Sequence, residues 1–271
     1  MQRVLDSRVA RASLASLLAV GVAVPLATPA QANTAGNVIF GEFEIDGNFY
    51  EGFANTTTAT GPDGPPVDWG SSDIYPDEVD VVEDPLGGAD PSIYDQGSKE
   101  DDLASWNDTS SAGPPSKGDV GNVYVHDRLV ADDQYVFLAF ERATDNGTVT
   151  YYLELNQQPN TTNALGTPIP DRLLGDIRLT IENQGSGNFQ VIRVETWDGD
   201  SWVDAGAGPT DVIEAINDST INVPGGTRAQ DEFGEFGFNL TELDLELGAH
   251  RPVSPRSTCV RSRATTKATR S

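Results

Sequence analysis

Residues 148–156 read Thr-Val-Thr-Tyr-Tyr-Leu-Glu-Leu-Asn, and this stretch decides the fold class. Large apolar residues fall at every second position, so an extended chain would place four of them on one face: Val149, Tyr151, Leu153 and Leu155. The preceding pair, Asn146-Gly147, favours a tight turn because both residue types tolerate the positive φ of two-residue hairpin loops. We therefore predict a half-buried strand, joined by this turn to the strand before it.

Similar patterns recur on both sides of this strand. Stretches rich in β-branched and aromatic residues predict further strands at Asn37–Ile45, Val123–Val125, Tyr135–Arg142, Ile177–Asn183, Phe189–Trp197 and Phe233–Leu240. Trp197 and Trp202 flank a turn and are placed to close a second hairpin. Only Thr210–Asn217 has the spacing of a helix, and Asp101–Trp106 could form one helical turn. The sequence thus predicts an all-β fold, a jelly-roll-like antiparallel β-sandwich with at most one short helix.

Residues 61–120 differ from the rest of the chain. They contain 15 acids, two lysines, eight prolines and eight glycines, with few large apolar side chains. Such a stretch cannot form much sheet of its own, so we expect a long acidic loop inserted into the domain. Its few large apolar residues are expected to pin it to the core: Trp69, Ile74, Tyr94, Leu103 and Trp106.

The aspartates of this loop suggest a cation site. They recur every three or four residues where the insertion begins, and Ca²⁺ takes six to eight oxygen ligands in a flexible shell. We predict Ca²⁺ as the only cofactor, with ligands from Asp73, Asp77, Asp80, Asp84, Asp101 and Asp102. A solvated acidic loop without a metal is the alternative, because no D-x-D-x-D-G loop is present.

The two ends of the chain differ from the acidic body. Residues 1–32 have the parts of a cleavable secretory signal: Arg3, Arg8 and Arg11, then a small apolar run, then Ala30-Gln31-Ala32. Residues 249–271 carry five arginines, one lysine and no acid. We expect residues 33–248 to form the β-sandwich domain and the last segment to be a truncated or frame-disturbed end, a basic tail being the alternative.

Charge and residue content exclude several functions. Between residues 33 and 248 there are 41 acids against eight Lys and Arg, and this balance repels nucleic acid and anionic membranes. No stretch beyond the leader is long and apolar enough to span a bilayer, so we expect no membrane insertion of the mature chain. The chain has two histidines, His126 and His250, and no G-x-S-x-G motif. We predict no enzymatic activity and interpret His126 as a surface residue.

The tryptophans support a second hypothesis. Trp69, Trp106, Trp197 and Trp202 could be platforms on which sugar rings stack, as in a carbohydrate-binding module. The competing interpretation is that they pack in the core or close hairpins.

A family resemblance agrees with an exported β-domain. It is carried by Phe43-Glu-Ile-Asp-Gly-Asn48, Val67-Asp-Trp69, Gly97-Ser-Lys-Glu-Asp-Asp102 with Trp106, Pro115-Ser-Lys-Gly-Asp119 with Asn122-Val-Tyr124, and Tyr151-Tyr-Leu-Glu-Leu-Asn-Gln157. In this order the motifs resemble the acidic N-terminal β-domain of actinobacterial secreted and cell-surface proteins, which continue into Ig-like or prealbumin-like repeats. The opening Ile-Asp-Gly and Asp-Trp motifs are also distantly similar to sugar-binding and cytochrome-domain sandwiches.

This resemblance implies an adhesin-like or architectural domain that is not an enzyme. We therefore expect a secreted, extracellular bacterial protein, associated with the cell surface, whose partner is an extracellular protein or a glycan. The resemblance supplies no catalytic residues.

Overall fold

The computed structural model describes residues 38–50, 67–71, 74–87, 94–96, 102–108, 116–183, 189–206 and 212–243. Within these ranges nearly all regular structure is β, and every strand pair is antiparallel. The helical elements there are two 3₁₀ turns, η1 (Leu103–Ser105) and η2 (Ser116–Gly118). The predicted all-β class is confirmed, and η1 lies inside the predicted turn at Asp101–Trp106. The predicted leader and the basic end lie outside the described residues.

The larger sheet has five strands in the order β14-β17-β7-β6-β3. Its long members are β6 (Val120–Val130) and β7 (Asp133–Arg142), which form a hairpin, and β17 (Phe233–Asn239) pairs with the other side of β7. The edges are β3 (Asp80–Val82) and β14 (Val212–Ile216).

The smaller sheet has four strands in the order β13-β12-β11-β8. They are β8 (Val149–Leu155), β11 (Ile177–Asn183), β12 (Phe189–Trp197) and β13 (Trp202–Asp204). Trp197 pairs directly with Trp202, so the predicted tryptophan-closed hairpin is confirmed. The bounds of β11 and β12 coincide with the predicted ranges.

Four small hairpins complete the described fold. They pair β1 (Val38–Phe40) with β2 (Phe43–Ile45), β4 (Tyr94–Gln96) with β5 (Asn107–Asp108), β9 (Thr161–Thr162) with β10 (Pro168–Ile169), and β15 (Ile221–Val223) with β16 (Gly226–Arg228). The short β3, β4 and β5 agree with the expectation that residues 61–120 form little sheet.

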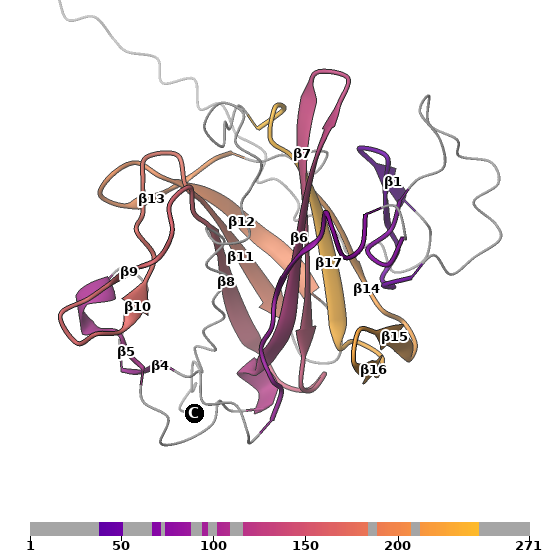
Figure 1. Ribbon diagram of the computed structural model, residues 1–271, viewed down its shortest axis with the longest axis horizontal. Coiled ribbons are helices and arrows are strands. Elements are labelled where there is room, and N and C mark those ends of the chain that lie inside the picture. The colour runs from indigo at the N-terminus through magenta and orange to yellow at the C-terminus, as the bar shows by residue number, and fades with distance from the viewer. Residues whose placement is uncertain are drawn as a thin grey trace, which may run out of the picture.

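Two hydrophobic clusters bury the five-stranded sheet on both faces. The first joins it to the four-stranded sheet through residues such as Leu138, Phe236, Leu153 and Leu179. All four alternating residues of the deciding stretch belong to it: Val149, Tyr151, Leu153 and Leu155. Figure 1 shows β8, β11 and β12 on one side of β6, β7 and β17, and the β1–β2 hairpin on the other. A cluster shared by two sheets is what the predicted sandwich requires.

The second cluster lies on the opposite face of the five-stranded sheet. Residues 38–50, 67–71 and 74–79, which we call the N-terminal cover, supply Phe43, Phe49 and Trp69 to it. The sheet contributes Phe137 and Phe233, among others. The Phe43 and Phe137 rings stack with centroids 4.3 Å apart. The cover is thus an additional layer that the sandwich prediction did not include.

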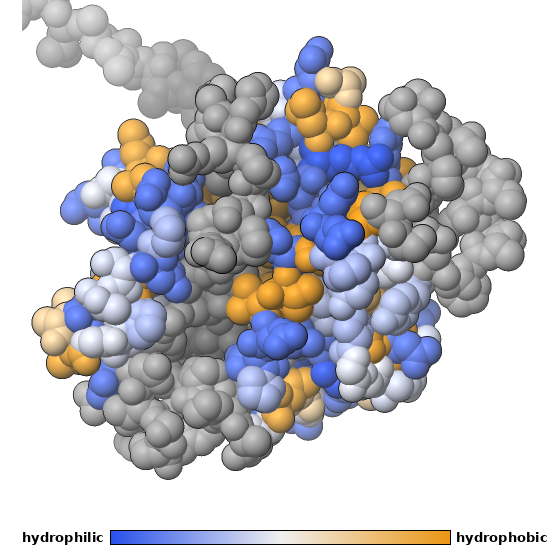
Figure 2. All heavy atoms as spheres, in the orientation of Figure 1, coloured by the Kyte–Doolittle hydropathy of each residue, from blue (hydrophilic) through white to orange (hydrophobic). Residues whose placement is uncertain are grey.

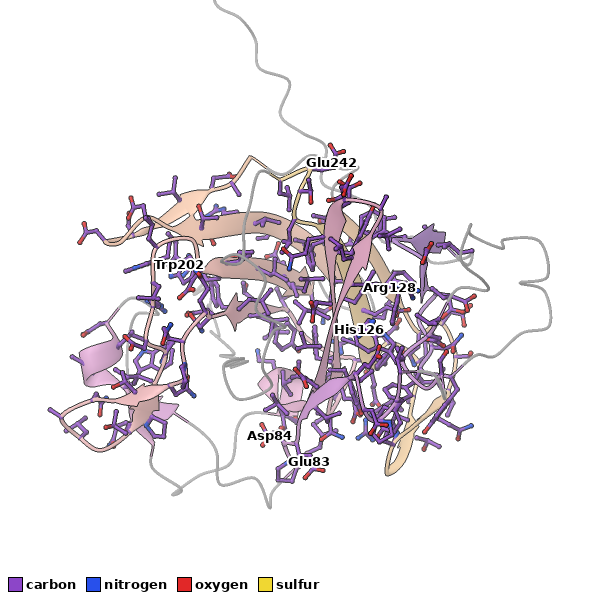
Figure 3. All side chains as sticks on the ribbon, turned by 45° about the horizontal axis from the view of Figure 1, so that its top comes forward. Glu83, Asp84, His126, Arg128, Trp202 and Glu242 are labelled. Atoms are coloured by element: carbon purple, nitrogen blue, oxygen red, sulfur yellow. The ribbon has the colours of Figure 1, made fainter. Side chains whose placement is uncertain are left out.

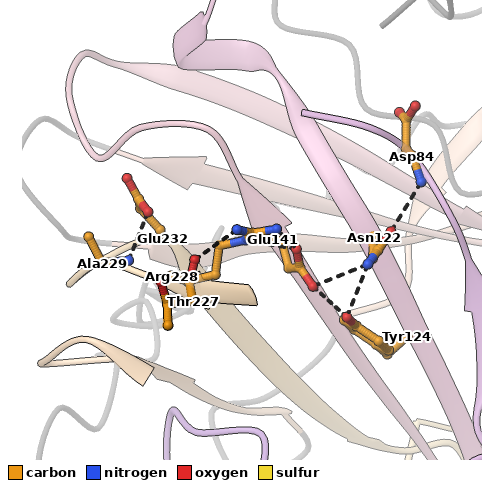
Figure 4. A network of polar contacts seen from close by, with 8 residues as sticks. All are labelled: Asp84, Asn122, Tyr124, Glu141, Thr227, Arg228, Ala229 and Glu232. Atoms are coloured by element: carbon orange, nitrogen blue, oxygen red, sulfur yellow. Dashed lines mark hydrogen bonds and ion pairs between the residues drawn. The ribbon is translucent and has the colours of Figure 1, made fainter. Parts of the chain in front are cut away.

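A polar network fastens the β15–β16 hairpin to the central sheet (Figure 4). Glu141 on β7 accepts hydrogen bonds from Tyr124 Oη and, through Oε2, from Arg228 Nε at 2.7 Å. Asn122 Nδ2 lies 3.4 Å from Glu141 Oε1, and Asn122 Oδ1 accepts the N–H of Asp84 at 3.2 Å. One buried carboxylate therefore connects β6, β7 and β16.

The prediction of a hairpin at Asn146-Gly147 is wrong in its pairing. Gly147 does have a positive φ of 88°, as the turn requires. The strands that it joins nevertheless belong to different sheets, because β7 pairs with β6 and β17, and β8 pairs with β11. Both edges of β7 are already occupied, so the turn carries the chain from one sheet to the other.

The predicted helix at Thr210–Asn217 is wrong for its described part, residues 212–217, which contains strand β14 in register with β17 from Val212 opposite Phe238 to Ile216 opposite Gly234. Apolar residues of β14 reach both hydrophobic clusters, Val212 and Ile216 the first and Ala215 the second. A strand covered on both faces loses its two-residue alternation, and the remaining spacing imitates a helix.

The single strand predicted at Asn37–Ile45 is a hairpin of two short strands. Gly41 and Glu42 both have positive φ, 54° and 62°, and turn the chain between β1 and β2. A Cβ atom on Gly41 would lie 2.4 Å from the ring of Tyr135, so the close approach also requires glycine.

Candidate functional site

The outer face of the four-stranded sheet carries a row of charged residues in register. Arg178 on β11 lies between Glu154 on β8 and Glu195 on β12, and Asp204 on β13 follows Glu195. Their neighbours along the strands, Ile177 and Leu179, point to the opposite face and into the first cluster, as strand alternation requires. We call the outward set the tryptophan–arginine face: Tyr152, Glu154, Arg172, Arg178, Glu195, Trp197 and Trp202.

Two ion pairs organise this face. Arg178 Nε donates to Glu195 Oε2 at 2.9 Å, and the hydroxyl of Thr180 donates to the same oxygen at 3.1 Å. Arg172 binds Glu154 in bidentate fashion, with Nε 2.9 Å from Oε2 and Nη2 2.5 Å from Oε1. These four side chains are largely shielded from solvent, so each charge has a partner within hydrogen-bond distance in a region of low polarity.

The guanidinium groups also lie against aromatic rings. The Cζ atom of Arg178 is 4.7 Å from the ring centroid of Trp202 and 5.2 Å from that of Tyr152. Arg172 Cζ is 5.1 Å from the centroids of both Trp197 and Trp202. The two tryptophan rings meet edge to face at 5.3 Å, and both residues are half-buried. Cation–π contacts of this kind fix the ring orientation.

The indole N–H of Trp202 is a buried donor on this face. Trp202 Nε1 is buried, and no acceptor among the described residues lies within hydrogen-bond distance of it. A buried N–H without a partner costs free energy.

The loop that places Arg172 is anchored by Asp176. This buried carboxylate accepts the N–H groups of Leu173 at 2.7 Å and Gln157 at 2.9 Å. Burial raises the pKa of Asp176, and these hydrogen bonds oppose the increase. The next residue back, Gly175, has a φ of 87° and donates to the carbonyl of Trp197 at 2.9 Å. The loop therefore brings Arg172 over the tryptophan pair.

This face carries much of the positive charge in the described chain. Three of the cationic residues, Arg172, Arg178 and Arg193, belong to the outer face of the four-stranded sheet or to the loop over it. Arg193 is 53% exposed and lies 3.4 Å from Glu195 Oε1. The described cations are Lys117, Arg128, Arg142, Arg172, Arg178, Arg193 and Arg228. The visible face in Figure 2 is mostly hydrophilic where it is described, with apolar side chains in small separate groups.

The tryptophans predicted as stacking platforms do not lie together. Trp69 is fully buried between the N-terminal cover, to which it belongs, and the five-stranded sheet, and Trp106 is 7% exposed. Neither ring lies on a surface, so for these two residues the competing core interpretation is correct. Trp202 does lie on an outer face, with Trp197 as its hairpin partner (Figure 3).

The predicted calcium ligands are spread over the described chain. Asp77 and Asp102 are exposed, Asp80 and Asp84 are half-buried, and Asp73 and Asp101 lie outside the described residues. Burial raises the pKa of Asp80 to about 6, and the charge of Asp127 adds to the increase. Among the residues that the structure describes, no three His, Cys, Asp or Glu side chains converge as metal ligands. Figure 3 shows Asp84 beside Glu83, well apart from Trp202. Calcium binding stays a prediction.

The interpretation of His126 as a surface residue is wrong. It lies within β6, is 5% exposed, and its ring is 5.7 Å from that of Phe43. Its Nδ1 atom lies 3.0 Å from the carbonyl oxygen of Glu78, and burial lowers the pKa of the imidazole. The N-terminal cover buries it, and no local pattern in the sequence indicates that layer.

Buried carboxyl groups are the feature that the sequence analysis missed. Glu235, Asp68 and Glu214 are each at most 3% exposed. The sequence does indicate the burial of one of these acids, because Glu235 lies within the apolar stretch Phe-Gly-Glu-Phe-Gly-Phe of residues 233–238. An acid inside such a run has to find hydrogen-bond donors in the core.

Comparison with known proteins adds no relative. No family model, curated protein or solved structure matches this chain. In the described ranges no helix is long and apolar enough to cross a membrane.

Proposed function

We propose that this protein is an exported bacterial domain, associated with the cell surface, that acts by binding an extracellular glycan through the tryptophan–arginine face. One observation carries the proposal: Trp197 and Trp202 are paired and half-buried beside oriented ion pairs. Sugar rings bind to proteins through such a combination, because their C–H faces stack on aromatic rings and their hydroxyl groups need polar partners.

The polar groups on this face suit binding better than catalysis. Glu154 and Glu195 are each hydrogen-bonded to an arginine, so their oxygens serve as oriented acceptors. The export signal predicted in residues 1–32 would bring the domain into contact with extracellular polysaccharides.

Fluorescence titration with a panel of soluble oligosaccharides tests the proposal. We expect at least one neutral oligosaccharide to change the tryptophan emission and to bind at micromolar to millimolar concentration. Trp202→Ala should weaken this binding at least about tenfold, since a central aromatic contact contributes about 2 kcal/mol or more. Leu129→Ala is the matched control because Leu129 is exposed on the β6–β7 hairpin. Absence of a response across the panel, or equal binding by the Trp202→Ala variant, contradicts the proposal.

A second candidate is a surface module stabilised by calcium. The aspartates at positions 73–102 of the acidic insertion motivate it. The test is the midpoint of thermal unfolding, measured in calcium and in chelator. An unchanged midpoint would contradict calcium binding. The glycan titration is independent of this result.

A further inference from the structure

Glu235 on β17 is held by the N-terminal cover. It lies between the small side chains of Ala139 on β7 and Ala215 on β14, in register with both. Its Oε1 atom accepts hydrogen bonds from the N–H groups of Asp46, at 2.6 Å, and Gly47, and its Oε2 atom accepts one from Trp69 Nε1 at 2.9 Å. All three donors belong to the cover, so one carboxyl group of the sheet holds two of its three segments, 38–50 and 67–71.

A second buried acid lies in the same region. Asp68 is fully buried, and its Oδ1 atom accepts the N–H of Trp69 at 2.6 Å. Its Oδ2 atom is buried and has no hydrogen-bond partner within the described residues. Trp69 therefore bridges the two acids, through its backbone N–H to Asp68 and its indole N–H to Glu235.

The charges around this pair are negative. Asp46 and Glu44, in the cover, act on Asp68, and Asp218, in the turn after β14, acts on Asp46. The titratable groups that β6 presents to the cover have other partners: Tyr124 Oη donates to Glu141, and His126 Nδ1 contacts the Glu78 carbonyl.

The nearby arginines are also engaged. Arg128 pairs with Glu42 at 3.0 Å, and Arg228 pairs with Glu141. Among the described residues no cation is seen to compensate Asp68 and Glu235. Two adjacent anions in such a site would be costly, because burial removes the water that stabilises charge.

The hydrogen bonds indicate where a proton resides. Both oxygens of Glu235 face N–H donors, and a proton on either oxygen would point toward a donor. Asp68 Oδ2 faces none within the described chain, so it is the free position. Burial raises the pKa of Asp68, with the charge of Glu235 as the next cause, and burial with the charge of Asp46 also raises the pKa of Glu235. The three donors favour Glu235 as the ionised member of the pair.

We propose that Asp68 and Glu235 form a proton-operated latch: one proton on Asp68 Oδ2 keeps the N-terminal cover docked on the five-stranded sheet, and its loss releases the cover. The consequence is directional. Under acidic and neutral conditions the cover shields the second hydrophobic cluster, and under alkaline conditions repulsion between the two carboxylates exposes Phe43, Phe137 and their neighbours. The latch lies on the opposite face of the five-stranded sheet from the four-stranded sheet and does not depend on the proposed function.

Hydrogen exchange measured by mass spectrometry on the full chain tests the latch. In the wild type, exchange of residues 43–50 and 67–71, corrected for the intrinsic rate, should be at least about tenfold faster at about pH 9 than at about pH 6. Asp68→Asn keeps the acceptor for the Trp69 N–H and carries no charge at either pH. This variant should keep the cover protected at about pH 9.

Two further variants distinguish release of the cover by the latch from a general loss of stability. Glu214→Gln removes a different buried acid, one that faces the first cluster beside Phe236, and should leave the response of the cover unchanged. Glu235→Gln brings an amide N–H toward N–H donors and should expose the cover at both pH values. Equal corrected rates in the wild type at the two pH values would overturn the latch even if no variant folds. It would also be overturned by an unaltered pH response in Asp68→Asn or by full protection of the cover in Glu235→Gln.

Discussion

Two regions of this molecule bury acidic side chains in different ways. On the tryptophan–arginine face, Glu154 and Glu195 each accept a hydrogen bond from a guanidinium group at 2.9 Å. Where the N-terminal cover meets the five-stranded sheet, Glu235 and Asp68 accept hydrogen bonds from backbone and indole N–H groups. A guanidinium supplies a compensating charge together with its hydrogen bonds, whereas an N–H group supplies only a dipole. The first region should therefore respond most to loss of a partner, and the second to pH.

The largest effect is expected for Arg178→Ala. The substitution leaves Glu195 buried, with Thr180 and the weakly placed Arg193 as its described partners. Removal of one member of a buried pair costs about 3 to 5 kcal/mol of unfolding free energy, because the remaining charge is uncompensated. Urea unfolding measures the loss. The double substitution Arg178→Met with Glu195→Leu should restore much of the stability, and a double variant no better than Arg178→Ala would contradict this account.

Trp69→Phe is expected to have the next largest effect. It retains an aromatic ring in the second cluster but removes the N–H that donates to Glu235 at 2.9 Å. A hydrogen bond to a charged group contributes about 1.5 to 3 kcal/mol, and we expect a loss in this range. Urea unfolding of Trp106→Phe provides the comparison for loss of a buried indole elsewhere. Equal losses of unfolding free energy for the two variants would show that the hydrogen bond to Glu235 contributes no additional stability.

The third largest effect is expected for the contribution of Glu214 to the pH dependence of the unfolding free energy. Its Oε2 atom accepts the N–H of Val191 across the two sheets at 2.7 Å, and burial raises its pKa from 4.5 to about 7. A raised pKa means that the folded state binds the proton more tightly, so this stability is present below the ordinary value and is lost as pH rises through about 7. Between about pH 5 and about pH 8.5 the wild type should lose about 2 kcal/mol more than Glu214→Gln. Chemical denaturation at both pH values measures the difference, and parallel pH profiles would refute it.

The smallest effect is expected for Arg128→Ala. Arg128 pairs with Glu42 at 3.0 Å, but the Arg128 side chain is 28% exposed. Exposed ion pairs contribute about 0 to 1 kcal/mol because water and salt screen them. The midpoint of thermal unfolding should fall slightly at low salt and not at high salt. A loss as large as that of Arg178→Ala would show that exposure does not distinguish the two arginines.

The sequence predicted the strands better than their partners. The alternation in residues 148–156 is local, and all four apolar residues are buried as expected. The pairing of β7 is not local, because Phe137 lies opposite His126 on one side and Gly237 on the other. The residues Asn146-Gly147 predict that the chain reverses its direction, but they do not predict which sheet β8 joins. That choice depends on distant strands.

The candidate sites depended even more on distant residues. Trp202 was identified from its hairpin, since Trp197 is close in the sequence. Arg172 and Arg178 were not, because they reach the tryptophans from a loop and from another strand. His126 was misplaced because the layer that buries it is the N-terminal cover, and the composition of that layer does not indicate what it covers.

The order of the strands along the chain has a consequence for how the molecule forms. The whole four-stranded sheet comes from one continuous segment, Val149–Asp204, whereas the five-stranded sheet is completed only when β14 and β17 arrive. Tyr135 then pairs with Asn239 across about a hundred residues of chain, and such distant closure is slow. A chain synthesised from its N-terminus can therefore complete the four-stranded sheet, with the tryptophan–arginine face, first. The N-terminal cover can form its hydrogen bonds to Glu235 only after β17 has been synthesised.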